Sequence, residues 1–252
     1  MKTTDNTILI TGGGSGIGRS LAEAFHALGN QVIISGRRQQ ALDETTAANP
    51  GMQSLTVDMT DPASIRSFAA RLAEAYSSLN VLVNNAGIMR LEHLLAQPED
   101  LSDAEATVTT NLLGPIRLTA ALLPLLHKQP RATVMTVSSG LAFVPKVMTP
   151  TYCATKAAIH SYTQSLRYQL KETAVEVIEL IPPYVATTLM GEQQSEDPNA
   201  MPLDEFITEV MNILKTQRDT TEICVKRVHP LRFAAEEGQE KYEQVFQGLN
   251  AS

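Results

Sequence analysis

The stretch that decides the fold is TILITGGGSGIG, which runs from Thr7 to Gly18. A short run rich in β-branched residues is followed by a turn made almost entirely of glycine. Apolar residues then recur at the spacing of one helix face: Ile17, Leu21, Ala24, Phe25 and Leu28. Gly29 closes this pattern, as glycine commonly does at the end of a helix. The stretch therefore predicts a strand, a tight turn and a helix in direct succession.

The same alternation continues along the chain. Further strands are expected at QVIIS, QSLTVD, NVLVNNAG, ATVMTVSS and VEVIELI, with a last one at TEICVK near Ile223. Helices are expected near Gln39 to Ala48, after Asp61-Pro62, from about Ser102 to His127, and around Tyr152. Strands that alternate with helices form right-handed crossovers and a parallel sheet. The expected fold class is therefore α/β, a doubly wound parallel sheet of about seven strands with helices on both faces.

Length and composition limit the possible classes of protein. The chain has 252 residues, of which 43% are hydrophobic, and it carries a net charge of −7. Without a linker or an internal repeat, residues 1–252 are expected to form a single domain. The negative charge argues against nucleic acid or an anionic membrane as a partner. No apolar run approaches the roughly 20 residues that span a bilayer, so we expect no membrane segment.

The cysteines and histidines bear on compartment and metal. Cys153 and Cys224 suggest neither a disulfide framework nor a metal-binding spacing, which fits a reducing, cytoplasmic location. The five histidines are scattered and include no HxxxH pair. The sequence therefore predicts no metal site.

The segment TLMGEQQSEDPNAMPL, from Thr188 to Leu203, is the most polar part of the chain. It follows the sixth predicted strand and precedes an amphipathic helix with Phe206, Val210 and Ile213 on one side. Its position makes residues 188–218 a candidate substrate-binding lid. An ordinary surface loop remains the alternative.

The glycine-rich turn TGGGSGIG, from Thr11 to Gly18, suits the binding of a phosphate group. Glycines let the backbone approach a pyrophosphate, and the following helix offers free N–H groups at its N-terminus. The stretch also approaches the GxxxxGK[ST] loop of nucleoside triphosphatases, but Arg19 stands where that loop needs lysine. A dinucleotide site is therefore favoured.

The end of the second predicted strand indicates which dinucleotide. An acidic residue there would accept hydrogen bonds from a ribose 2′-hydroxyl, whereas arginine suits the 2′-phosphate of NADP. Arg37 and Arg38 occupy this region, and the first acid downstream is Asp43. Because guanidinium groups bind phosphate in a bidentate manner, we expect NADP(H) to be preferred, with NAD(H) possible.

Tyr152 and Lys156 lie four residues apart, on one face of the expected helix. A tyrosine of pKa about 10 exchanges protons poorly at neutral pH, and a nearby ammonium group favours its phenolate form. The hydroxyl of Ser138 or Ser139, at the end of the fifth strand, could polarise a substrate oxygen. Thr136 stands where the GxSxG motif of esterases needs glycine, which argues against a nucleophilic serine.

The ordered set TGGGSGIG, NNAG (Asn84 to Gly87), Asn111, Ser139 and Tyr152-x-x-x-Lys156 resembles the short-chain dehydrogenase/reductase family, from the first strand to about Thr188. The stretches LLPLLHKQP, SSGLAF, YCATKAAIHS and VEVIELIPP further resemble its DltE-like group of bacterial oxidoreductases. The resemblance implies a Rossmann-like sheet. It also implies hydride transfer between NADP(H) and a carbonyl or secondary alcohol substrate, and a homodimer or homotetramer. A non-catalytic NADP(H)-binding redox sensor on the same fold is the alternative function.

The resemblance also implies residue roles. Tyr152 is expected to be the general acid/base, and Lys156 to lower its pKa and hold the nicotinamide ribose. Ser139 is expected to stabilise the substrate oxygen, and Asn111 to kink its helix and anchor a water molecule. The other expected cofactor contacts are Gly12, Ser15, Gly16, Ile17, Gly18, Arg37, Arg38, Asp58, Met59, Asn85, Ala86, Gly87, Pro182, Val185 and Thr187. Pro183 stands where the family usually has glycine, which puts the local path of that loop in doubt.

Overall fold

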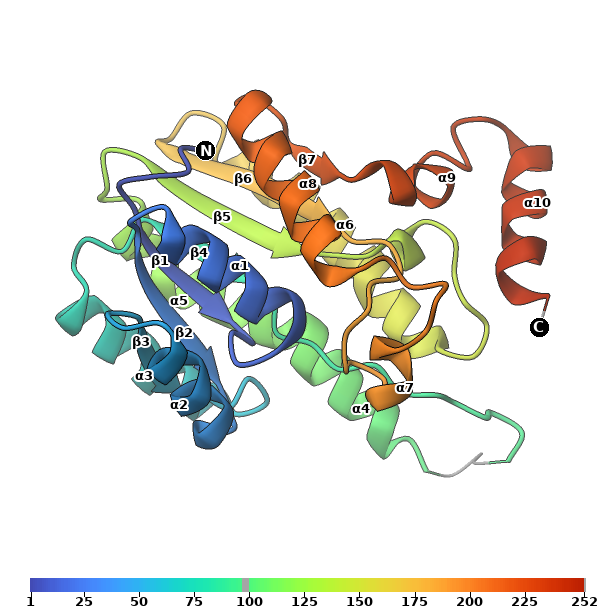
Figure 1. Cartoon of the computed structure of the whole chain (residues 1–252), viewed down its shortest axis with the longest axis horizontal. Helices are drawn as coiled ribbons and strands as arrows, with labels where there is room; N and C mark the ends of the chain where they lie inside the picture. Colours follow the sequence, from blue (N-terminus) through green and yellow to red (C-terminus); the bar gives the residue numbers. More distant parts are fainter. Residues whose placement is uncertain (97–99, 252) are drawn as a thin grey trace.

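A computed structural model of the chain describes residues 1–96 and 100–251, and in this part a seven-stranded sheet forms the centre of the molecule (Figure 1). The strands are β1 (Thr7–Thr11), β2 (Gln31–Gly36), β3 (Gln53–Thr56), β4 (Val81–Asn84), β5 (Ala132–Val137), β6 (Val175–Ile181) and β7 (Glu222–Cys224). Their order is β3-β2-β1-β4-β5-β6-β7, and neighbouring strands run parallel. The predicted α/β fold class is confirmed.

Helices cover both faces of this sheet (Figure 1). They are α1 (Gly16–Ala27), α2 (Gln39–Ala48), α3 (Pro62–Ala75), α4 (Ser102–Val108), α5 (Gly114–Leu126), α6 (Pro150–Gln169), α7 (Glu192–Ser195), α8 (Leu203–Thr216), α9 (His229–Arg232) and α10 (Gln239–Asn250). Side chains of α1, α2 and α8 share one core layer with the sheet. Those of α3, α5 and α6 share the other. None of the described helices is both long and apolar enough to cross a bilayer.

The two core layers explain why the strands are apolar without interruption. Along β1, Ile8 and Ile10 join the layer of α1 and α8, and Leu9 between them joins the layer of α3 and α5. All three side chains are fully buried. A strand covered on both faces needs an apolar residue at every position rather than at alternate ones.

The helix expected from about Ser102 to His127 is divided by a π-helical turn, Thr109–Leu113, between α4 and α5. Asn111 lies in this turn. Its Oδ1 accepts a hydrogen bond from Ile88 N and its Nδ2 donates one to Ile88 O, both at 2.8 Å. The turn therefore directs the Asn111 side chain to the backbone of the loop that follows β4.

The C-terminal helix α10 was not predicted. It is bound to the loop before α6 through Asn250, whose Nδ2 donates to Pro145 O at 3.1 Å and whose Oδ1 accepts from Val147 N at 2.9 Å. None of the residues of α10 is fully buried. Because the helix contributes so little to the core, its pattern carries a weak apolar signal.

The glycine turn after β1 packs directly against the end of β4. Gly12 has a φ of +69°, a conformation that glycine adopts without strain. A Cβ atom at Gly18 would lie 2.3 Å from Gly12 O and 2.3 Å from Asn85 Nδ2. The first turn of α1 therefore reaches its place only without a side chain at position 18.

We expect Gly18→Ala to lower the free energy of unfolding by about 1–3 kcal/mol, because the new methyl group meets backbone atoms that cannot rotate away. Urea unfolding followed by circular dichroism measures this change. Gly248→Ala is the matched control, since a Cβ there meets nothing within 4 Å. Equal stability of the Gly18 variant and the parent chain would show that this contact does not constrain the fold.

Candidate active site

Helix α6 carries the central pair of the site. The loop after β4 fixes where α6 begins, because Glu92 accepts hydrogen bonds from Thr151 N at 2.9 Å and from Thr151 Oγ1 at 2.7 Å. A carboxylate at this position also suits the positive end of the helix dipole. Glu92 was not predicted from the sequence, because no motif around it signals this role.

Tyr152 and Lys156 lie on the same face of α6 as predicted, and both are buried, with exposed fractions of 7% and 6%. The Lys156 Nζ lies 5.5 Å from the centre of the Tyr152 ring and donates a hydrogen bond to Val137 O at 2.8 Å. Val137 is the last residue of β5. The pair is therefore tied to the carboxyl edge of the sheet.

Burial dominates the protonation of this pair. It raises the pKa of Tyr152, with the nearby Ser139 hydroxyl working in the opposite direction. It lowers the pKa of Lys156 to about 8, and the Glu179 carboxylate works against that decrease. The net shift of the Tyr152 pKa in the protein alone is upward, because desolvation of the phenolate outweighs the hydrogen bond with Ser139; the lowering by Lys156 stays a prediction.

The two serines after β5 have different surroundings. Ser139 Oγ accepts a hydrogen bond from Leu141 N at 3.1 Å, and its hydroxyl is close enough to Tyr152 to affect that residue's pKa. Ser138 is 2% exposed, and its Oγ lies 3.5 Å from Leu180 O. Ser139 is thus the serine that faces the tyrosine.

The glycine turn and the residues after β4 meet at Thr11. Its Oγ1 accepts hydrogen bonds from the backbone N–H groups of Asn85 and Ala86, each at 3.0 Å. Asn85 Nδ2 donates to Thr11 O at 2.9 Å. Gly87 lies close to the other end of this segment, where a Cβ would come 3.3 Å from Asn111 Oδ1. The carboxyl ends of β1 and β4 are thereby joined into one surface, next to the point where the strand order reverses.

The N-terminus of α1 fits a phosphate group. Ser15, at its N-cap, makes no side-chain cap, and no acidic residue stands in the first turn. The N–H groups of Gly16, Ile17 and Gly18 therefore lie in a first turn without a capping side chain, where an anion is favoured. Thr187 reaches this turn as well, because a Cβ at Gly16 would lie 3.4 Å from Thr187 Cγ2.

Two exposed arginines, Arg37 and Arg38, follow the end of β2 as expected. Asp58, one of the expected cofactor contacts, stands close by, because Arg37 helps to lower its pKa. The larger cause of that decrease is hydrogen bonding from Thr60 N at 2.9 Å and Thr60 Oγ1 at 2.7 Å. Met59 is 4% exposed, and its side chain packs in the core.

The loop after β6 keeps an ordered path despite Pro183. Pro182 O accepts a hydrogen bond from Gly140 N at 2.9 Å, and Val185 forms a β-bridge with Met201. Gln194, from α7 within the segment expected to act as a lid, donates to Val185 O at 2.8 Å and to Thr187 Oγ1 at 3.2 Å. Gln194 therefore links this segment to the predicted cofactor loop, a role that the sequence did not signal.

The chain is similar to known proteins over nearly its whole length. The short chain dehydrogenase profile matches residues 6–198. The chain is 39% identical to the uncharacterized oxidoreductase DltE of Bacillus subtilis strain 168, over 99% of this chain and 98% of that protein. It is 30% identical to an NADP-dependent 3-hydroxy acid dehydrogenase of Schizosaccharomyces pombe, over 89% of this chain and 92% of that one.

The fold is shared with solved structures of the same kind. A short chain dehydrogenase/reductase from Burkholderia phymatum in complex with NAD superposes with a TM-score of 0.81, over 94% of this chain and 95% of that one, at 20% identity. The predicted resemblance is confirmed by the matched profile and the near full-length relative. The chain belongs to the short-chain dehydrogenase/reductase family, in its DltE-like group, and is an oxidoreductase.

Proposed function

We propose that the protein transfers a hydride between NADP(H) and a carbonyl or secondary alcohol substrate, with Tyr152 as general acid/base. The observation that carries this proposal is the buried placement of Tyr152 and Lys156 on one face of α6, with Ser139 beside the phenol. When bound, the nicotinamide supplies or accepts the hydride. The remaining tasks fall to the protein.

Tyr152 gives a proton to the substrate oxygen during reduction and takes it back during oxidation. Its raised pKa keeps the hydroxyl protonated, which is the form needed for the first step. The ammonium of Lys156 stabilises the phenolate as the proton leaves, and the Ser139 hydroxyl donates to the substrate oxygen. Asn111 is bound on both sides of its amide to Ile88, so it holds the loop after β4 in place beside these residues.

The cofactor contacts follow from the surfaces already described. The first turn of α1 would hold the pyrophosphate, and Asn85, Ala86 and Gly87 would face the adenosine side. Arg37 and Arg38 would contact a 2′-phosphate, with Asp58 modulating Arg37 from nearby. The relative from Schizosaccharomyces pombe is an NADP-dependent enzyme by name, which supports the same preference here.

The segment over residues 188–218 is proposed to cover the substrate. Gln194 attaches this segment to Val185 and Thr187, which supports the role. A ligand that moves Thr187 would move the segment with it. We also propose a homodimer or homotetramer, with the exposed faces of α5 and α6 as the contact surface.

The alternative is an NADP(H)-binding sensor without catalysis. The retained tyrosine, lysine, serine and asparagine favour an enzyme over a sensor. A panel of aldehydes, ketones and secondary alcohols, each tested with NADPH and NADH, distinguishes the two. Turnover supports the enzyme, whereas tight NADPH binding without turnover of any compound supports the sensor.

We expect Tyr152→Phe to lower kcat by about 10²–10⁴-fold, since it removes the proton donor and leaves the ring in place. The dissociation constant for NADPH, measured by fluorescence titration, should remain close to that of the parent enzyme. Tyr162→Phe is the matched control, because Tyr162 packs on the same helix against the α3 and α5 layer. Undiminished turnover by the Tyr152 variant would contradict the mechanism.

We expect Arg37→Ala to raise the KM for NADPH by about 10–100-fold, because the variant loses one charge-assisted hydrogen bond to the 2′-phosphate. The KM for NADH should change little, since NADH has no 2′-phosphate. Steady-state kinetics with both cofactors measure the difference. Arg66→Ala, at an exposed position of α3, removes the same charge away from the site and should change neither value. An equal change in the KM for NADPH and for NADH in the Arg37 variant would show that Arg37 does not bind the 2′-phosphate.

A further inference from the structure

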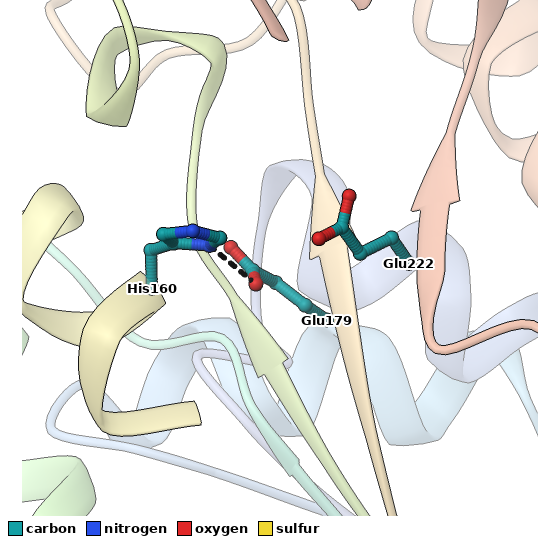
Figure 2. Close-up of side chains that lie close together, drawn as sticks. All are labelled: His160, Glu179 and Glu222. Carbon is teal, nitrogen blue, oxygen red and sulfur yellow. Dashed lines mark hydrogen bonds and ion pairs between the residues drawn. The ribbon is translucent and has the colours of Figure 1, made fainter. Parts of the chain in front are cut away.

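Three titratable side chains that lie far apart in the sequence meet beside α6. Figure 2 shows His160 of α6 directed toward Glu179 of β6, with Glu222 of β7 beyond it. One ligand-type atom from each lies within 4.8 Å of the others. In the described part of the chain, no other group of histidine, cysteine and acidic side chains is gathered closely enough to suggest a metal.

A metal is not needed to explain this cluster, because Glu222 already has a cation. Arg232 Nε lies 2.7 Å from Glu222 Oε2 and Arg232 Nη2 lies 3.2 Å from Glu222 Oε1. Both carboxylate oxygens are therefore engaged by one guanidinium group. Arg232 also pairs with Glu236 at 2.6 Å. The charge of Glu222 is balanced at the edge of the cluster.

Glu179 has no such partner. Its side chain is fully buried, its Oε2 accepts a hydrogen bond from His160 Nδ1 at 2.8 Å, and its Oε1 has no hydrogen-bond partner among the described residues. Gln164 donates its amide to His160 Nε2 at 3.1 Å. The imidazole thus lies between the Gln164 amide and the Glu179 carboxylate. His160 therefore orients the Glu179 side chain.

The Glu179 carboxylate also acts on Lys156. Tyr152, Lys156 and His160 follow one another at steps of four residues along one face of α6. Glu179 pairs with Thr136 in the register of β5 and β6, and Lys156 Nζ is bound to the carbonyl of Val137, the next residue of β5. The carboxylate and the ammonium group thus stand over adjacent positions of neighbouring strands.

The electrostatic effect on Lys156 agrees with this geometry. Burial lowers the pKa of Lys156 and the Glu179 carboxylate raises it. The titratable or charged groups that face the lysine are Tyr152 and His160 from α6 and Glu179 from β6. Behind Glu179 stands Arg232 with its two carboxylate partners, Glu222 and Glu236.

We infer that Glu179 is a positioning residue for the reaction proposed above: its buried carboxylate, oriented by His160, holds Lys156 in the ammonium form beside Tyr152. The role of Glu179 in catalysis rests on the proposed function. Its effect on the charge of Lys156 rests on the structure alone. The oxygen of Glu179 that lacks a hydrogen-bond partner is then balanced at a distance, by the ammonium group.

The direct test is the titration of Lys156 in the full-length protein with ¹³C-labelled lysine, followed through the Cε chemical shift. Lys156→Arg identifies the signal by its loss. In Glu179→Gln, we expect the Lys156 transition to move to lower pH by about one unit, since the attracting charge is gone. An unchanged transition would overturn the inference.

The matched control is the double variant Glu222→Gln/Arg232→Gln, which removes one negative and one positive charge from the same cluster. Its Lys156 transition should stay where it is in the parent protein. A shift equal to that of Glu179→Gln would mean that any change in this cluster moves the lysine, and would overturn the assignment. If Glu179→Gln does not fold, Glu179→Asp keeps the charge on a shorter arm and should shift the transition in the same direction by less. No shift in that variant would also count against the inference.

Activity gives the second readout. Reduction should fall as pH rises through the pKa of Lys156, about 8 in the parent chain. In Glu179→Gln this decline should begin at lower pH by the same interval that the Cε titration shows. Because the titration needs no substrate, absence of turnover in the parent protein would contradict the proposed function and leave the charge effect measurable. A pH profile that does not follow the titration would contradict the catalytic role of Glu179.

Discussion

The close contact between the glycine turn after β1 and Asn85 after β4 is the constraint on which the rest of the molecule depends. It joins the ends of two neighbouring strands at the point where the strand order reverses. With the turn pressed against Asn85, α1 begins directly above the sheet edge and its first N–H groups face outward. The ligand surface therefore follows from the absence of a β-carbon at Gly12, Gly13 and Gly18, where one would lie 2.9, 2.5 and 2.3 Å from neighbouring atoms. A polar group at Thr11 then locks the arrangement through the backbone of Asn85 and Ala86.

Most of the fold could be read from the sequence because its signals are local. A strand buried on both faces must be apolar throughout, and a helix on the sheet must carry one apolar face, so both patterns stand out in β1 and α1. Helix α10 lies outside the core and leaves no such pattern, and α7 has only four residues. The π-helical turn at Asn111 was anticipated only as a kink, because one extra residue in a helical turn changes no composition.

The residues of the candidate site also fall into those that the sequence predicted and those that it did not. Tyr152, Lys156 and Ser139 could be named because spacing and motif order reveal them. Glu92, Gln194 and Glu179 could not, since each acts through a contact between segments that are far apart in sequence: Glu92 with Thr151, Gln194 with Val185, and Glu179 with His160. The direction of the Tyr152 pKa was also missed. A helical spacing shows that a cation is near, whereas the depth of burial that opposes it is a property of the folded chain.

The π-helical turn between α4 and α5 has a consequence for how this chain can change in evolution. A π turn holds one residue more than the α turn it replaces, so deleting one residue from Thr109–Leu113 would restore a regular helix in which α4 and α5 keep their faces. The apolar face of α5 would stay on the sheet, but the wide turn that directs the Asn111 amide to Ile88 would be lost. The length of this segment is therefore constrained by the Asn111–Ile88 contact and not by the packing of α5. Insertions and deletions should accumulate in the surface loops of the lineage and be absent here.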